Sequence, residues 1–236
     1  SSDKLSGDVK GLRIGLPDEY FNGVGAEISD AVMNAVKELE KKGAVIEKIS
    51  LKMTEYAVPV YYLIATSEAS SNLSRFDGIR YGRRPDGVES LSDLYEKARS
   101  EGFGGEVKRR IVLGTYSLSS GYYDAYYLKA LKGRTLIIND FKEAYKKCDV
   151  IMSPVAANTA FGIGEKMNDP LAMYLSDILT ISANLAGVPG ISVPAGLDSQ
   201  KMPIGLQIMG NYFKERDILN AAKAVEGVFG KYEPQI

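Results

Sequence analysis

A strand–helix–strand pattern near the N-terminus constrains the fold more than any other feature of this sequence. Residues 12–17, LRIGLP, form a short β-type run closed by a proline, and residues 44–51 alternate as a second strand. Between them, residues 27–43 have helical spacing and end in Lys-Lys-Gly, a common helix terminus. The predicted buried side of this helix consists of Ile28, Val32, Ala35, Val36 and Leu39. This unit predicts an α/β architecture.

Further strands are predicted toward the other end of the chain, with helices between the two groups. Residues 149–156 are typical of a buried strand, and residues 190–196 and 203–210 are predicted as two strands joined by the polar loop LDSQKM. The predicted helices are 54–76, 90–103 with Ser90 and Asp93 as its cap, 106–148, 171–186 and 215–232. We expect the 106–148 stretch to be two or three helices divided at Gly114, Gly121 and Gly133. The pattern fits one sheet with a central helical insertion, and equally half of a larger sheet.

The sequence contains no histidine and a single cysteine, Cys148. Catalytic Ser-His-Asp and Cys-His groups and histidine metal sites are therefore excluded. An intramolecular disulfide and a cysteine-based zinc site are excluded as well. Cys148 falls at the predicted junction between a helix and a strand, so we interpret it as structural. We predict no metal site, and any acid–base chemistry must use carboxylates, Lys, Tyr or Ser.

Composition indicates a soluble globular protein, with 45% hydrophobic residues, 25% charged residues and a net charge of -1. A charge so close to zero argues against nucleic-acid binding through bulk electrostatics. No signal peptide is visible and no apolar run approaches the about 20 residues that span a bilayer. We therefore expect a cytoplasmic protein without a membrane partner. Residues 1–10 are polar and are predicted as a tail or linker before a single domain over 11–236.

Two polar stripes stand out on predicted helices. Asp177 lies in a mainly apolar segment and shares a stripe with Thr180 and Asn184. That stripe either meets solvent, which the pattern alone favours, or lines a polar cavity in which a ligand ammonium pairs with Asp177. A second stripe begins at Tyr61 and continues through Glu68 and Asn72; its function does not follow from the pattern.

Two basic clusters, at residues 80–84 and 108–110, are most simply a solvated face or partners of carboxylates. Glu106 lies four residues before Arg110, a spacing that predicts a surface ion pair on a helix. RNA contact by the 80–84 loop stays open as an alternative.

Four long segments carry a resemblance to a known family. They are SEASSNLSRFDGIRYG (67–82), RSEGFGGEVKRRIVLGTYSLSSGYYDAYYLKA (99–130), NLAGVPGISVPAG (184–196) and PIGLQIMG (203–210). Together they closely resemble the C-terminal half of the A subunits of tRNA-dependent glutamine amidotransferases, a branch of the amidase signature family. The resemblance implies an α/β/α sandwich around a large mixed sheet, of which this chain would be the C-terminal half with a central helical insertion.

Members of that family cleave amides with a Ser–cis-Ser–Lys triad in a Gly/Ser-rich region of their N-terminal half. No such segment occurs in this sequence, and the SSG at 119–121 does not fit the motif. The resemblance thus implies a part of an enzyme that holds no catalytic residue and is inactive alone. The whole subunit would release ammonia from glutamine, and a partner would use it to amidate glutamate or aspartate mischarged on tRNA.

The resemblance also implies which residues bind glutamine. Arg110 matches the position that holds the α-carboxylate, Asp177 the position that holds the α-ammonium, and Tyr61 a supporting hydrogen-bonding position. The residue types suit these roles, because the planar guanidinium fork matches a carboxylate and an aspartate opposes an ammonium. Arg109 is a one-residue alternative to Arg110.

The partners implied by the resemblance are the B and C subunits, the missing N-terminal half and glutamine, with tRNA met only indirectly. No cofactor is expected in this subunit, whereas ATP and Mg are expected in the partner subunit. If strands of the missing half normally flank those present here, unpaired edges would favour an oligomer, a co-folded companion segment or a rearranged packing. Two alternatives remain: a small-amide hydrolase of the same family, and a non-enzymatic binding or interaction module.

Overall fold

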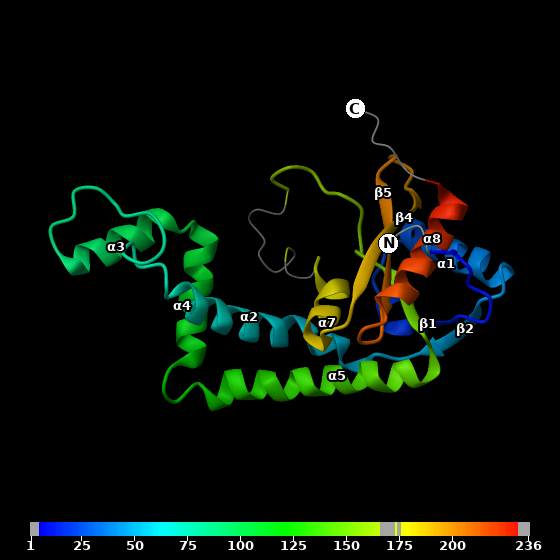
Figure 1. The fold of residues 1–236 in the computed structure, drawn as a ribbon, viewed down its shortest axis with the longest axis horizontal. Helices are drawn as coiled ribbons and strands as arrows, with labels where there is room; N and C mark the ends of the chain where they lie inside the picture. The colour runs from blue at the N-terminus through cyan, green and yellow to red at the C-terminus, as the bar shows by residue number, and fades with distance from the viewer. Residues whose placement is uncertain (1–4, 166–172, 174–175, 231–236) are drawn as a thin grey trace. The chain divides into compact units, whose positions relative to one another are not determined.

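The structure is a computed structural model that describes residues 5–165, 173 and 176–230, and within it one part of the chain forms a five-stranded mixed sheet. Its strands are β1 (Arg13–Pro17), β2 (Val45–Ile49), β3 (Val150–Pro154), β4 (Gly190–Leu197) and β5 (Pro203–Gly210). In the order β2-β1-β3-β5-β4, β1 runs parallel to β2 and β3, whereas β5 is antiparallel to β3 and β4 (Figure 1). This arrangement confirms the predicted α/β class with a mixed sheet.

The chain folds as two units. One comprises Ser1–Val58 and Arg134–Ile236 and contains the sheet; the other comprises Pro59–Gly133 and is helical, as predicted for the central insertion. The helices are α1 (Ala26–Lys41), α2 (Ala57–Leu73), α3 (Leu91–Gly102), α4 (Gly105–Leu118), α5 (Lys129–Lys147), α7 (Ile178–Ala186) and α8 (Glu215–Phe229). Shorter helical turns are η2 (Asp18–Phe21), η3 (Lys52–Tyr56) and η4 (Asp124–Leu128). Among the described residues, no helix is both long and apolar enough to cross a membrane.

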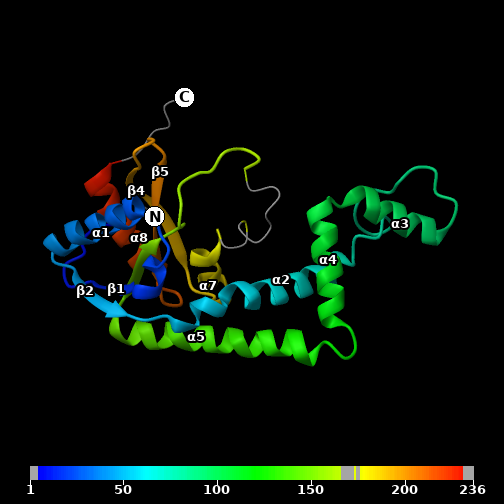
Figure 2. The same cartoon turned by 180° about the vertical axis from the view of Figure 1, so that it is seen from behind.

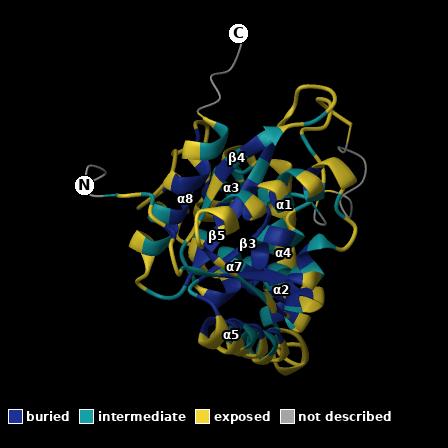
Figure 3. Ribbon diagram, turned by 90° about the vertical axis from the view of Figure 1, so that its right-hand side faces the viewer, coloured by how far each residue is buried: buried dark blue, intermediate teal, exposed yellow. Residues whose placement is uncertain are grey.

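Helices α1 and α8 cover one face of the sheet. The buried residues of α1 are the five predicted from sequence: Ile28, Val32, Ala35, Val36 and Leu39. They join the main hydrophobic core together with buried residues of α8 and alternate residues of the central strands. Both helices carry buried residues on one side and exposed residues on the other (Figure 3), as expected for amphipathic helices on a sheet.

Helix α7 lies on the opposite face of the sheet. Ser153 of β3 and Gln207 of β5 are paired across the ladder, and their side chains alternate with the residues of the main core. The Gln207 amide donates to Ser153 Oγ at 3.2 Å and to the Leu179 carbonyl of α7 at 2.9 Å. The sheet is therefore covered on both faces, which is the layering of an α/β/α sandwich.

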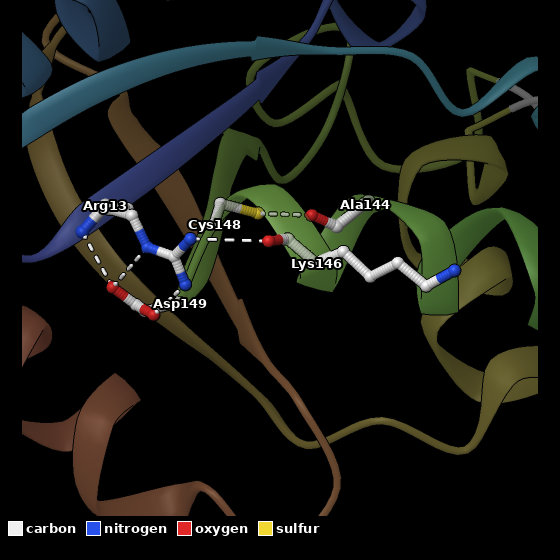
Figure 4. Close-up of polar contacts among 5 residues, drawn as sticks. All are labelled: Arg13, Ala144, Lys146, Cys148 and Asp149. Atoms are coloured by element: carbon white, nitrogen blue, oxygen red, sulfur yellow. Dashed lines mark hydrogen bonds and ion pairs between the residues drawn. The ribbon is translucent and has the colours of Figure 1, made fainter.

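Arg13 joins the start of β1 to the junction between α5 and β3 (Figure 4). Its Nη2 lies 2.7 Å from Asp149 Oδ1, and its backbone N–H donates to Asp149 Oδ2 at 2.9 Å. At the same junction Cys148 is buried and its Sγ donates to the Ala144 carbonyl at 3.3 Å. Burial raises the pKa of the Cys148 thiol to about 12. Cys148 thus has the structural environment that the sequence predicted.

The helical unit confirms the predicted cap of α3. The backbone N–H of Asp93 donates to Ser90 Oγ at 3.1 Å, and the Asp93 carboxylate accepts from the backbone N–H of Glu89 at 3.1 Å. Two donors at the start of the helix are satisfied in this way.

The predicted division of the 106–148 stretch at three glycines was wrong at two of them. The chain breaks at Gly121, which has a φ of 87°, but Gly114 and Gly133 lie inside α4 and α5. A Cβ on Gly133 would lie 2.8 Å from Val60 Cγ2, and one on Gly114 would lie 2.0 Å from the Thr66 carbonyl oxygen. These two glycines allow close packing of helices instead of ending them.

Three predicted helix boundaries also need correction. The predicted helix 54–76 divides into η3 and the shorter α2. The predicted helix 171–186 is interrupted by a turn at 176–177, after which α7 begins; residues 171, 172, 174 and 175 lie outside the described residues. The last helix also ends earlier than the predicted 232, because α8 stops at Phe229 and Gly230 is its C-cap; residues 231 and 232 lie outside the described residues.

Candidate functional site

Arg110 projects from α4 and is held by Glu106 of the preceding turn. Arg110 Nε lies 2.8 Å from Glu106 Oε1, which confirms the ion pair predicted from the i, i+4 spacing. Arg109 bonds the other carboxylate oxygen, with its Nε 2.9 Å from Glu106 Oε2. Hydrogen bonds from Arg110, and then from Arg109, lower the pKa of Glu106, so its carboxylate stays charged at neutral pH.

The guanidinium of Arg110 also lies over an aromatic ring of α2. Its Cζ is 5.5 Å from the centre of the Tyr62 ring, a cation–π distance. The Tyr62 ring in turn meets the ring of Tyr61 edge-on, with centroids 5.3 Å apart and planes at 88°. Within the helical unit, Arg110 and Tyr61 therefore each contact the ring of Tyr62.

A close crossing of α2 and α4 fixes these positions (Figures 1 and 2). The helices touch at Gly114 and Thr66, and the buried hydroxyls of Ser67 and Ser117 bond each other at 2.6 Å. Arg110 lies one turn before Gly114, just as Tyr62 lies one turn before Thr66. The turns that precede this crossing are the ones that carry the contact between Arg110 and Tyr62.

Asp177 belongs to the sheet unit, not to the helical unit that holds Tyr61 and Arg110. It is exposed and occupies the N-cap position of α7, where its side chain makes no capping hydrogen bond. A carboxylate at this end of a helix is favoured by the helix dipole. Asp177 and Asn184 are exposed and Thr180 is half-buried, which agrees with the predicted alternative that this stripe meets solvent; Asp177 itself lies at the N-cap, just before the helix.

The other two members of that stripe are satisfied locally. Thr180 Oγ1 donates to the Asp177 carbonyl at 3.0 Å, and Asn184 Nδ2 donates to the Thr180 carbonyl at 3.0 Å. The exposed carboxylate of Asp177 is consequently the member of the stripe best suited to meet a ligand cation.

A cavity of about 300 Å³ opens in the sheet unit beyond the end of β3. Ser176, the neighbour of Asp177, contributes to its wall. The lining is mainly small and apolar: Ile28, Val155, Ala156, Ala157, Asn158, Thr159, Ala160, Phe161, Ser176, Pro203, Ile204 and Gly205. No group of three or more residues suited to hold a metal ion occurs within the described ranges.

Tyr62 and Glu106 are the site residues whose roles the sequence did not predict. The i, i+4 spacing predicted the contact of Glu106 with Arg110, but not its second bond to Arg109. The contact of Tyr62 with Arg110 joins two helices far apart in the sequence, and helical periodicity carries no signal for it.

Comparison with known proteins identifies the family. The family model described as Amidase matches residues 2–219. Among the A subunits of glutamyl-tRNA(Gln) amidotransferases, that of Chromobacterium violaceum is 60% identical over 219 residues, which cover 92% of this chain and 45% of that protein. The corresponding protein of Lachnospira eligens is 55% identical over 233 residues, covering 98% and 48%.

Solved structures agree with these matches. One is the same kind of protein from Thermotoga maritima, which is similar with a TM-score of 0.71 and 38% identity over 94% of this chain and 44% of that one. A bacterial aryl acylamidase of the amidase signature family shares the fold, with a TM-score of 0.70 at 21% identity over 96% of this chain and 45% of that one. The chain spans about half the length of the curated relatives it matches. On this evidence the chain belongs to the amidase family.

Proposed function

We propose that this chain is the glutamine-binding part of the glutaminase subunit of a glutamyl-tRNA(Gln) amidotransferase. The single observation that carries the proposal is the arrangement of Arg110 over Tyr62 beside Tyr61, in a chain 60% identical to one of the A subunits of these enzymes. The expected product of the whole subunit is ammonia, which a partner uses to amidate glutamate, or aspartate, mischarged on tRNA.

The proposed site holds glutamine by its two charged ends. Arg110 binds the α-carboxylate, because a guanidinium fixed in its plane by Glu106 and on its face by Tyr62 presents a preformed fork. Asp177 pairs with the α-ammonium from its exposed position before α7. Tyr61, whose ring contacts Tyr62, supplies a supporting hydrogen bond, and glutamine's side-chain amide is left for the nucleophile.

The bond-breaking step is assigned to the part of the relatives that this chain does not span. There, the nucleophilic serine of the Ser–cis-Ser–Lys triad that the family resemblance implies would attack the amide carbon and release ammonia. Water would then cleave the resulting acyl-enzyme. We expect the B and C subunits as partners in the cytoplasm, ATP and Mg in the partner subunit, and only indirect contact with tRNA.

The outer strands support a companion to this chain. In the described part of the sheet, β2 pairs with β1 alone and β4 with β5 alone, and each carries an exposed apolar residue, Val45 and Leu197. Such edges associate with further polypeptide. The remaining half of the subunit is the companion that we propose.

Alanine variants of the two arginines test the carboxylate contact. In the assembled, full-length amidotransferase, Arg110→Ala is expected to raise the KM for glutamine about 100-fold, because a charge-assisted bidentate contact is lost. Arg109→Ala is the matched control, since it removes the neighbouring cation from the same Glu106. If only Arg109→Ala raised the KM for glutamine strongly, Arg109 and not Arg110 would be the residue that binds the α-carboxylate. If neither variant changes the KM, the proposal is wrong.

Asp177→Ala separates the glutaminase from a hydrolase of small amides. We expect glutamine cleavage to fall while cleavage of a simple amide without an ammonium continues, because only glutamine needs the carboxylate. An equal fall with both substrates would argue for a structural role of Asp177 and for the small-amide hydrolase.

A further inference from the structure

We propose that Tyr62 is a positioning residue, which holds Arg110 and Tyr61 in the geometry that binds the amino-acid end of the substrate. This inference rests on the proposed function and adds a residue to the site. The guanidinium of Arg110 is thereby preorganised to bind a carboxylate before the substrate binds.

Tyr62 contacts both of the residues proposed to bind the substrate, Arg110 and Tyr61. Arg110 Cζ lies 5.5 Å from the centroid of the Tyr62 ring, and the Tyr61 ring is nearly perpendicular to it, with the two centroids 5.3 Å apart. An aromatic face attracts a cation, and an edge-to-face pair fixes the relative orientation of two rings. A shift of Tyr62 therefore moves both neighbours.

Arg110 is constrained from two directions. Glu106 Oε1 binds the guanidinium in its plane, through Nε at 2.8 Å, and Tyr62 lies over its face. Neither contact alone would define the guanidinium, because a single ion pair on a surface leaves a long side chain mobile. Together they define both the position and the plane of the guanidinium, which is what a bidentate contact with a carboxylate requires.

Tyr62 lies outside the close packing between α2 and α4. Tyr62 is only half-buried, whereas the close packing of α2 against α4 is made one turn further on, by Thr66, Ser67, Gly114 and Ser117. Replacement of Tyr62 should consequently leave the helix crossing intact. The expected loss is in substrate binding, not in stability.

The test compares Tyr62→Leu with Tyr62→Phe in the full-length protein within the assembled amidotransferase. Tyr62→Phe keeps the ring and is expected to retain the glutamine KM within about two-fold of the parent. Tyr62→Leu removes the aromatic face and is expected to raise that KM about five- to ten-fold, with kcat within about two-fold, since the nucleophile lies elsewhere. Hydrolysis of a simple amide that lacks a carboxylate should be unchanged in both variants.

Equal glutamine KM values for the Leu and Phe variants would overturn the inference. So would a parallel fall of kcat with glutamine and with the simple amide, because that is the signature of a structural defect. Should Tyr62→Leu fail to fold, Tyr62→Met offers a flexible side chain of similar length without a ring, and the same expectations apply.

Arg110→Ala separates failure of this inference from failure of the proposed function. If Arg110→Ala raises the glutamine KM and Tyr62→Leu does not, Tyr62 has no positioning role while the binding assignment stands. If Arg110→Ala has no effect, the proposed function itself fails. When both are correct, Tyr62→Leu should add less than about two-fold to the KM of an Arg110→Ala enzyme, because Tyr62 acts through Arg110.

Discussion

Gly114 of α4 lies directly against the backbone carbonyl of Thr66 in α2. A Cβ built on Gly114 would come within 2.0 Å of that oxygen and within 2.7 Å of Ser70 Cβ. No side chain fits there without moving one helix away from the other. The separation of α2 and α4, and with it the contact between Tyr62 and Arg110, depends on the absence of a single carbon atom.

Gly114→Ala should therefore destabilise the protein although alanine is the better helix former. We expect a loss of about 1–3 kcal/mol in the free energy of unfolding, since the neighbour is backbone and cannot turn aside. Thermal or denaturant unfolding measures it. Gly102→Ala is the matched control, because Gly102 is helical and a Cβ added there would meet no atom within 4 Å; it should be neutral or slightly stabilising. Equal stability of the two variants would refute the argument.

Glu106→Gln should weaken glutamine binding without altering the chemical step. The amide can still accept one hydrogen bond, but it loses the charge that pairs with Arg109 and Arg110. We expect the glutamine KM of the assembled enzyme to rise about three-fold, with kcat unchanged. Glu101→Gln, an exposed change in α3, serves as the control. A lower kcat with an unchanged KM would contradict the assignment.

The Arg13–Asp149 pair should make a pH-dependent contribution to stability. Hydrogen bonds and charge from Arg13 lower the pKa of Asp149 below its ordinary value of 3.8. The contribution is thus fully present above the ordinary pKa and disappears as the pH falls through the lowered folded-state value. Both side chains are partly exposed, at 41% and 36%, so solvent screening keeps the contribution of the pair small.

The measurement is the free energy of unfolding of the parent and of Asp149→Asn between pH 7 and pH 2. The difference in the free energy of unfolding between the two proteins should be constant near pH 7 and shrink toward zero near pH 2. If this difference grew as the pH fell, the predicted direction of the pH dependence would be wrong.

Cys148 should resist alkylation in the native protein. Burial of its thiol raises the pKa to about 12, so little thiolate exists at about pH 8. Because it is the sole cysteine in the sequence, incorporation of iodoacetamide followed by mass spectrometry reports on this site alone. The chain unfolded in urea is the control and should react at the rate of a free thiol. Comparable rates in the two states would contradict the described packing at the start of β3.

Much of the fold follows from local patterns in the sequence. The five buried residues of α1 repeat with the helical period, and Ser90 with Asp93 predicts the start of α3; both are confirmed. Each of these signals lies within one turn or one face of one element. Predictions made from such local signals therefore do not depend on which element packs against the helix.

The failures arise where tertiary packing overrides local preference. Glycine is a poor helix former, so Gly114 and Gly133 were predicted to end helices, yet each allows a neighbouring helix to approach. Tyr62 was not predicted as part of the site because its contact with Arg110 crosses between helices. The site assignments of Tyr61, Arg110 and Asp177 stay predictions that the proposed variants test.

The pairing of β1 with β3 has a consequence for synthesis on the ribosome. Ile14 pairs with Val150, and Gly15 with Ile151, so the whole helical unit is translated between the two partners. During translation, the edge of β1 that pairs with β3 is unpaired while α2, α3 and α4 are synthesised. These helices can form contacts with one another in that interval. An edge of β1 that is interior in the finished sheet is thus unpaired until β3 has been synthesised.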